Sequence, residues 1–219
     1  SFALAQLIFS PLWGMASDKY GRRPIILISL IGGAASFLLF AFAANLTILF
    51  ISRFLQGAIA GASIPAARAY VADITSLDER VKEMGRLGAA LALGIIIGPA
   101  VGGLLAETAP QLPFLGAAAL AFLSFLFAWK FLPESLAFKS EHPLAIRKGL
   151  FASFTNMNKG IRGSLMPLFI LSFLWSFAIS NNQVAVPLLG IEKFAAGATE
   201  IGILFALLGI VSAFVQFLL

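Results

Sequence analysis

The chain has 219 residues, of which 60% are hydrophobic and only 11% are charged. A soluble domain carries about 45–50% apolar and about 25% charged residues, so this chain has too little polar surface to cover a globule in water. It contains no cysteine and a single histidine, His142. This composition excludes a Cys/His zinc site, a disulfide framework, a thiol nucleophile and a Ser-His-Asp triad in the apolar segments. We expect a membrane protein that is not an enzyme.

Apolar stretches long enough to cross a bilayer recur along the chain. A span needs about 20 mostly apolar residues, because about 30 Å of hydrocarbon is crossed at about 1.5 Å per residue. The first stretch, from Ser1 to Ala16, is shorter than this. Six stretches qualify in full: Ile25 to Ala44, Thr47 to Tyr70, Met84 to Ala106, Pro113 to Leu132, Ser164 to Leu189 and Thr199 to Leu219. Buried helices of a large soluble protein are a poor alternative, because these runs carry almost no ionisable residue.

The cations are distributed unevenly between the connections. Arg53 lies inside a span and Lys193 in the connection 190–198, while the other lysines and arginines lie in or beside the first, third and fifth connections. Cytoplasmic loops carry the excess of Lys and Arg, so we expect the loops 17–24, 71–83 and 133–163 to be cytoplasmic. The same rule accounts for the net charge of +5, and no nucleic-acid partner is expected.

The two ends and the charged middle of the chain predict its domain organisation. The sequence starts at Ser1 without a methionine, stops at Leu219 within an apolar stretch and shows no signal peptide. We therefore expect an internal segment of a longer protein. The charged run from Glu134 to Arg162 predicts a cytoplasmic linker at 134–163 between an N-terminal bundle, 1–133, and the start of a second bundle, 164–219.

The first cytoplasmic loop carries the most specific motif, formed by Gly14, Asp18, Lys19, Gly21, Arg22 and Arg23. A positive-inside turn would explain the cations and Gly21, but not an acid four residues after Gly14 at the end of a span. The spacing resembles G-x3-D-[RK]-x-G-R-[RK], the loop between the second and third spans of the major facilitator superfamily. Every defined position matches. Ala16, where the family often has leucine, is a departure.

A second motif lies within the stretch from Thr47 to Tyr70. Arg53, Gln56 and Gly57 resemble the R-x2-Q-G motif of the fourth span of that superfamily. A cation inside a span costs about 2.5–3.5 kcal/mol on insertion scales, so Arg53 must either snorkel to the outer interface or find a partner in the bundle. Gly57 and Gly61 are four residues apart and allow close helix approach whatever the function.

The next span carries a stripe of small residues with a proline. Its members are Gly85, Gly94, Gly98, Pro99, Gly102 and Gly103. Such a stripe can serve generic close packing, and the proline removes one backbone hydrogen bond and bends the helix. The complete spacing resembles the fifth-span motif associated with the antiporters of the superfamily.

The resemblance implies a fold and a charge network. It implies an all-α polytopic membrane protein of the major facilitator fold, of which this chain supplies about seven spans out of an expected twelve. The stretches from Tyr70 to Thr75 and from Leu132 to Ser135 also look like drug and tetracycline efflux members. Carried over, Asp18 and Arg22 join a network at the cytoplasmic face, with Asp73 as the partner of Arg22. This network is expected to latch the two bundles in one conformation.

The resemblance also implies a function, namely a proton-coupled antiporter of the cell membrane that exports drugs by alternating access. It would work as a monomer in the lipid bilayer, with the proton as coupling ion and with no other cofactor and no metal. A metabolite uptake symporter of the same fold, against which the Gly98-Pro99 pattern argues, and a non-transporting membrane sensor or scaffold are the alternatives. An ATP-driven pump is disfavoured, because the sequence has no G-x4-G-K-[ST] phosphate loop.

Few polar residues lie within the spans. All acids fall in loops or at span ends, so the coupling carboxylate is expected in spans outside this chain, with Arg53 as its partner. A cavity lined mainly by Phe, Leu, Ala and Trp175 suits hydrophobic or amphipathic molecules, such as tetracycline-like or multidrug substrates. The polar run at 181–183 indicates either substrate contacts or a break or interface exit near the outer end of its span. The candidate cavity residues are Gln6, Ser10, Asn181, Asn182 and Gln183.

Overall fold

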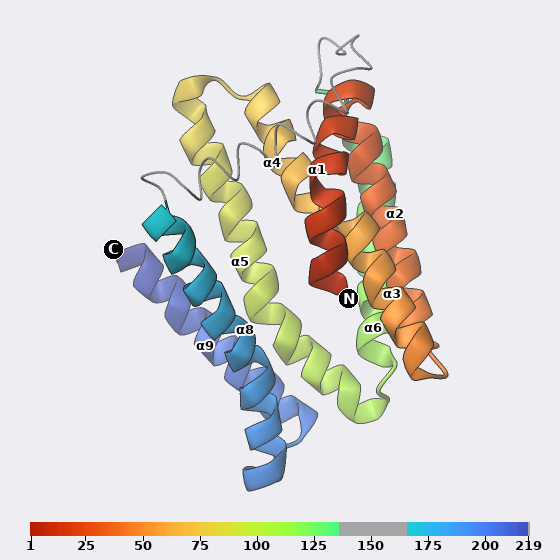
Figure 1. The fold of residues 1–219 in the computed structure, drawn as a ribbon, viewed down its shortest axis with the longest axis vertical. Helices are drawn as coiled ribbons and strands as arrows, with labels where there is room; N and C mark the ends of the chain where they lie inside the picture. The colour runs from red at the N-terminus through yellow and green to blue at the C-terminus, as the bar shows by residue number, and fades with distance from the viewer. Residues whose placement is uncertain (136–165, 219) are drawn as a thin grey trace. The chain divides into compact units, whose positions relative to one another are not determined.

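The computed structural model describes residues 1–135 and 166–218. Of the predicted linker at 134–163, only Glu134 and Ser135 belong to this part of the chain. The described residues form helices and no strands (Figure 1). The elements are α1 (Phe2–Tyr20), α2 (Arg22–Ala41), α3 (Leu46–Ile59), the 3-10 helix η1 (Ala60–Ala62), α4 (Ser63–Ile74), α5 (Leu77–Thr108), α6 (Leu112–Phe131), α8 (Met166–Phe194) and α9 (Ala198–Leu218).

Each predicted apolar stretch corresponds to one helix or one continuous run of helices. Within residues 1–135 and 166–218, five segments are long and apolar enough to cross a membrane, namely α2, the run from α3 through η1 to α4, α5, α6 and α8. The first predicted stretch corresponds to α1, and the last corresponds to α9, whose Ala198–Phe214 portion is a shorter apolar helix. The prediction of an all-α polytopic membrane protein is confirmed.

The connections are shorter than predicted, because the helices continue beyond the apolar residues. Gly21 alone separates α1 from α2, and only Thr75 and Ser76 lie between α4 and α5. Most of the predicted loops at 17–24 and 71–83 is therefore helical. The start of α5 is stabilised by Ser76, whose hydroxyl accepts from the Glu79 N–H at 3.4 Å and donates to Glu79 Oε2 at 2.9 Å. The composition of the sequence predicted the limits of each apolar segment. The limits of each helix depend in addition on the capping of its ends, as at the start of α5.

Helix α8 is also longer than predicted, and the polar run at 181–183 does not interrupt it. The helix continues to Phe194, so the predicted connection at 190–198 shrinks to residues 195–197. The side-chain amide of Asn181 donates to the Phe177 carbonyl oxygen at 3.1 Å, within the same helix. Because the acceptor of this amide lies one turn earlier in the same helix, the polar side chain is satisfied without breaking the main-chain hydrogen bonds of α8. The break that was one of the alternatives for this run is therefore not found.

The described helices belong to two compact units. The first contains α1 to α4, α5 as far as Ile95, and α6, and the second contains residues 96–107 of α5 together with α8 and α9. In the first unit α2 packs against α6, α3 and α4, and α1 packs against α3 (Figure 1). Close approach depends on small residues, since a Cβ at Gly57 would lie 2.2 Å from the Phe2 carbonyl oxygen. The close helix approach predicted at Gly57 is confirmed.

The predicted span from Thr47 to Tyr70 is bent where η1 separates α3 from α4. Pro65, near the start of α4, has no N–H to donate to the Gly61 carbonyl, which weakens the α-helical ladder at this point. The Trp13 indole N–H of α1 donates to the Ala58 carbonyl oxygen at 2.5 Å. Trp13 also packs against the buried cluster of Ile25, Ile26, Ala62, Ala66 and Tyr70. The bend is thus held from a neighbouring helix.

Candidate functional site

The centre of the candidate site is Arg22, the first residue of α2. Its Nη1 lies 2.5 Å from Asp18 Oδ1 of α1, and its Nε lies 2.9 Å from Asp73 Oδ2 of α4. Only 12% of the Arg22 side chain is exposed, against 60% for Asp18 and 26% for Asp73. A guanidinium shielded in this way and bonded to two carboxylates interacts more strongly than an exposed surface pair. The structure therefore contains the pairing of Arg22 with Asp73 that the family resemblance implies.

The turn before Arg22 explains why this side chain faces the two acids. Gly21 has φ 109° and ψ 157°, a conformation that favours glycine, and it reverses the chain within one residue. The buried Ser17 completes the arrangement from α1. Its hydroxyl accepts from Arg22 Nη1 at 2.6 Å and donates to the Gly14 carbonyl oxygen at 2.9 Å.

The first glycine of the motif has a different environment. A Cβ at Gly14 would meet no atom within 4 Å, so packing in the described residues does not require glycine at this position. Gly14 instead borders a cavity of about 240 Å³, which is also lined by Trp13, Ser17, Asp18, Arg22, Ala62, Pro65, Ala66 and Ala69. The charge network thus lies beside a partly open cavity lined by α1, α2, η1 and α4.

The other two cations of the loop motif contact different partners. The Lys19 ammonium lies 5.0 Å from the centre of the Tyr20 ring. Arg23 Nη2 donates to the Trp129 carbonyl oxygen in the last turn of α6, at 2.7 Å. Arg22 is therefore the residue of the motif that joins α1, α2 and α4, whereas Arg23 connects α2 with α6.

Sequence reasoning missed three members of this site. They are Ser17, Glu134 and Ser135. The Arg22 N–H donates to Glu134 Oε1 at 2.9 Å, and Ser135 Oγ donates to Asp73 Oδ2 at 3.4 Å. The signal for Glu134 and Ser135 was the stretch from Leu132 to Ser135, which resembles efflux proteins, but no local pattern shows that this stretch reaches Arg22 and Asp73, which lie 112 and 62 positions earlier.

Arg53 of α3 has partners inside the first unit. Its Nη1 donates to Gln56 Oε1 at 2.9 Å, and its guanidinium lies 4.3 Å from the centre of the Phe40 ring of α2. Phe40 in turn packs on Phe114 of α6, with ring centroids 4.3 Å apart. A cation over an aromatic face is stabilised by the ring quadrupole. Of the two alternatives left by the sequence, the structure shows a partner in the bundle.

Gln6 and Ser10 lie together in a hollow along α1. The hollow has a volume of about 400 Å³ and is lined by Ala3, Gln6, Leu7, Ser10 and Pro11. Gln6 also lies against the bend at η1, because a Cβ at Gly61 would be 3.0 Å from Gln6 Cγ. Two polar side chains in a mainly apolar hollow provide hydrogen bonding without many charges, as in sites for organic molecules.

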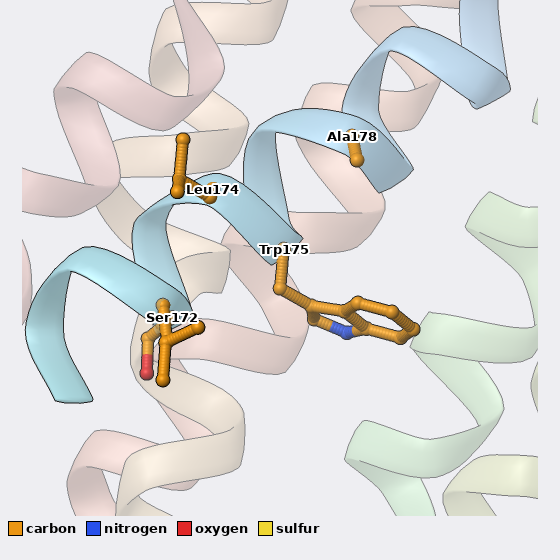
Figure 2. A pocket seen from close by; sticks show the side chains of 5 residues that line it. Ser172, Leu174, Trp175 and Ala178 are labelled. Carbon is orange, nitrogen blue, oxygen red and sulfur yellow. The ribbon is translucent and has the colours of Figure 1, made fainter. Parts of the chain in front are cut away.

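A second hollow lies along α8. It has a volume of about 540 Å³ and is lined by Leu171, Ser172, Leu174, Trp175 and Ala178 (Figure 2). Figure 2 shows the Trp175 indole extending away from the axis of α8, with Ser172 about one turn earlier in the helix. The three polar residues at 181–183 are exposed in the same helix but do not line this hollow. Trp175 therefore lines a hollow to which Asn181, Asn182 and Gln183 do not contribute.

The small-residue stripe of α5 does not behave as one packing surface. A Cβ at Gly85, Gly94, Gly98 or Gly102 would meet no atom within 4 Å. At Gly103 it would lie 2.5 Å from the Ala198 carbonyl oxygen of α9, and one at Gly202 of α9 would lie 2.3 Å from the Pro99 carbonyl oxygen. Within the second unit, Pro99 and Gly103 therefore form a close contact with α9.

Comparisons with known proteins agree with this architecture. The model of the family described as the Major Facilitator Superfamily matches residues 1–219. Multidrug resistance protein 2 of Bacillus subtilis (strain 168) is 34% identical over 223 residues, which cover 100% of this chain and 55% of that protein. Tetracycline resistance protein, class B, of Escherichia coli is 46% identical over 125 residues, which cover 57% of this chain and 31% of that protein.

A solved structure shows the same fold. The crystal structure of the human organic anion transporter MFSD10 (TETRAN) superposes with a TM-score of 0.70 and 26% sequence identity, covering 95% of this chain and 52% of that one. The chain spans about half the length of the relatives that match it along its whole length. The match along its full length, together with the helical membrane architecture, shows that the chain belongs to the Major Facilitator Superfamily.

Proposed function

We propose that the protein is a secondary active antiporter of the cell membrane, which exports hydrophobic or amphipathic small molecules in exchange for protons. The observation that carries this proposal is the bonding of Arg22 to both Asp18 and Asp73, from three different helices. The names of the relatives, multidrug resistance and tetracycline resistance proteins, support export of drug-like compounds.

The charge network suits a transporter that alternates between two conformations. Its acids are partly exposed at helix ends, so both can exchange partners without burying an unpaired charge. An ion-pair set that is complete in one conformation and incomplete in the other biases a two-state equilibrium. We assign Arg22, Asp18 and Asp73 this latch role, with the loops on their side of the membrane cytoplasmic.

The proposed substrate contacts are mainly apolar. The hollow beside Gln6 and Ser10 offers an amide and a hydroxyl among alkyl groups, and Trp175 offers an aromatic face in the second unit. A sugar would need many more hydrogen-bonding side chains, so a drug-like organic molecule fits better. No cofactor beyond the transported proton and no partner beyond the lipid bilayer is proposed, and the monomer is the working form.

The whole protein can be tested in everted membrane vesicles. Energised vesicles are given tetracycline or a cationic dye, and the internal pH is followed with a fluorescent indicator. An antiporter releases protons from the acidified lumen when substrate is added, and its substrate uptake stops with a protonophore. A symporter would move protons in the opposite sense, and a sensor or scaffold would leave the pH signal unchanged; either result contradicts the proposal.

A further inference from the structure

The N-terminus of α2 lacks the side-chain cap that a helix start normally has. Its N-cap residue is Gly21, which has no side chain to accept a hydrogen bond, and its first turn contains no acidic residue. The first N–H groups of a helix have no partner within the helix and must find an acceptor elsewhere. Arg22 is the first residue of this helix. The group that accepts a hydrogen bond from its N–H therefore also determines where the guanidinium of the charge network is held.

Glu134 provides that acceptor from a distant part of the sequence. The Arg22 N–H donates to Glu134 Oε1 at 2.9 Å, across 112 positions of the chain. The other carboxylate oxygen lies against the turn itself, since a Cβ at Gly21 would be 2.3 Å from Glu134 Oε2. The carboxylate thus contacts the turn at two consecutive residues, Gly21 and Arg22.

The segment that carries Glu134 is anchored on both sides. Leu132 packs against the buried cluster of the first unit, and its N–H donates to the Ala128 carbonyl oxygen at the end of α6 at 2.9 Å. On the other side, the Ser135 N–H donates to Glu134 Oε1 at 3.0 Å, and Ser135 Oγ reaches Asp73. Glu134 is therefore held in place by α6 and by the network, and does not depend on the turn alone.

The position of the carboxylate also matches the charges around it. A negative group at the start of a helix interacts favourably with the helix dipole. The main-chain N–H of Arg22 then points to Glu134, while its side chain points to Asp18 and Asp73, so the acids bind different parts of one residue. Removing Glu134 would leave the two ion pairs chemically intact but would release the backbone from which the guanidinium extends.

The geometry points to Glu134 as a positioning residue of the charge network, which holds the turn at Gly21 and thereby keeps Arg22 between Asp18 and Asp73. Its effect on transport rests on the proposed latch function, but its effect on the turn does not. The mobility of the turn and the rate of efflux therefore have to be measured separately.

The turn is measured by hydrogen–deuterium exchange of the whole purified protein, read in a peptide that covers residues 17–28. We expect Glu134→Ala to accelerate exchange in this peptide at least threefold, and Glu134→Gln, whose amide oxygen can still accept, to stay close to the unchanged protein. The control is Glu83→Ala, because Glu83 pairs with Arg86 at 2.6 Å within α5 and does not contact the turn. Glu134→Asp, which keeps the charge but shortens the reach, replaces Glu134→Ala if the latter does not reach the membrane.

Two results would overturn the assignment. Unchanged exchange in Glu134→Ala would show that the carboxylate does not hold the turn, and unchanged exchange in Glu134→Asp, where that variant replaces it, would show that the turn does not depend on the contact that the Glu134 carboxylate makes. Equal acceleration in Glu134→Gln and Glu134→Ala would show that the hydrogen bond is not what holds it. Efflux measured on the same variants separates the two proposals: a looser turn with normal efflux supports the positioning role of Glu134 and contradicts the latch role of Arg22.

Discussion

At the scale of single residues, one arginine is bound through its side chain and its backbone by different acids. Asp18 and Asp73 hold the guanidinium of Arg22, and Glu134 accepts its N–H. The loop motif predicted the first acid, because Asp18 lies four residues earlier and at the end of α1. Glu134 could not be predicted in this role, since nothing in a stretch after α6 shows which helix start it approaches.

The conformation of Gly21 gives a prediction about stability. Gly21→Ala places a Cβ at φ 109° and within 2.3 Å of Glu134 Oε2, so we expect a loss of about 1–3 kcal/mol in the free energy of unfolding. Gly14→Ala is the matched control, because its Cβ would meet no atom within 4 Å, and its effect should stay within about 0.5 kcal/mol. Thermal unfolding of the detergent-purified protein measures both, and equal midpoints for the two variants would contradict the expectation.

The shared guanidinium gives a prediction about efflux. Asp18→Asn and Asp73→Asn each remove one carboxylate from Arg22, so we expect efflux to fall at least fivefold while membrane abundance stays normal. Because both acids act through one arginine, the double variant should be little worse than either single variant. Glu83→Gln, at the start of α5, should keep normal efflux. Losses that multiply in the double variant would show that the acids act independently.

At the scale of elements, the predicted span from Thr47 to Tyr70 is a helix that bends at η1 and is held there by α1. The apolar run from Thr47 to Tyr70 predicted a single span but not the bend, because Pro65 alone does not say which turn is distorted. The partner of the bend, Trp13, lies 45 residues from Ala58 in sequence. Only the packing of α1 against α3 brings the two together.

This contact gives a prediction about Trp13. Trp13→Phe keeps most of the ring but removes the donor to the Ala58 carbonyl, and no water reaches a carbonyl in the hydrocarbon region to replace it. We expect a loss of about 1 kcal/mol in stability. Trp129→Phe, at a position 60% exposed, serves as the control and should change little. Thermal midpoints of the two variants are compared, and an unchanged midpoint for Trp13→Phe would contradict a stabilising role for this bond.

At the scale of the whole molecule, the distribution of the cations is the basis of the orientation that we propose in the membrane. The turn at Gly21 lies at one end of α2 and residues 42–45 follow its other end, so the two connections must lie on opposite sides of a spanning helix. The first side carries Lys19, Arg22 and Arg23, which the positive-inside rule assigns to the cytoplasm.

Cysteine labelling tests this orientation, because the chain has no cysteine of its own. Tyr20 is 55% exposed and Ala44 is also exposed, so a cysteine at either position is accessible if the reagent reaches that side. With an impermeant maleimide, we expect Ala44→Cys to react in intact cells and Tyr20→Cys to react only after permeabilisation. The opposite pattern would reverse the assigned orientation.

The sequence by itself determined the class of protein, the number of apolar segments and the identity of the loop motif, because these depend on composition and on spacing within one segment. The pairing of Arg22 with Asp73 followed from resemblance to a family. The tertiary structure alone decided that Glu134 caps α2, that Trp13 holds the bend at Ala58 and that Arg53 lies over Phe40. It also decided that the polar run at 181–183 stays helical. The physical reason is that a hydrogen-bond donor or a cation in an apolar segment must find a partner. The sequence alone does not show which of the candidate partners the fold brings close to it.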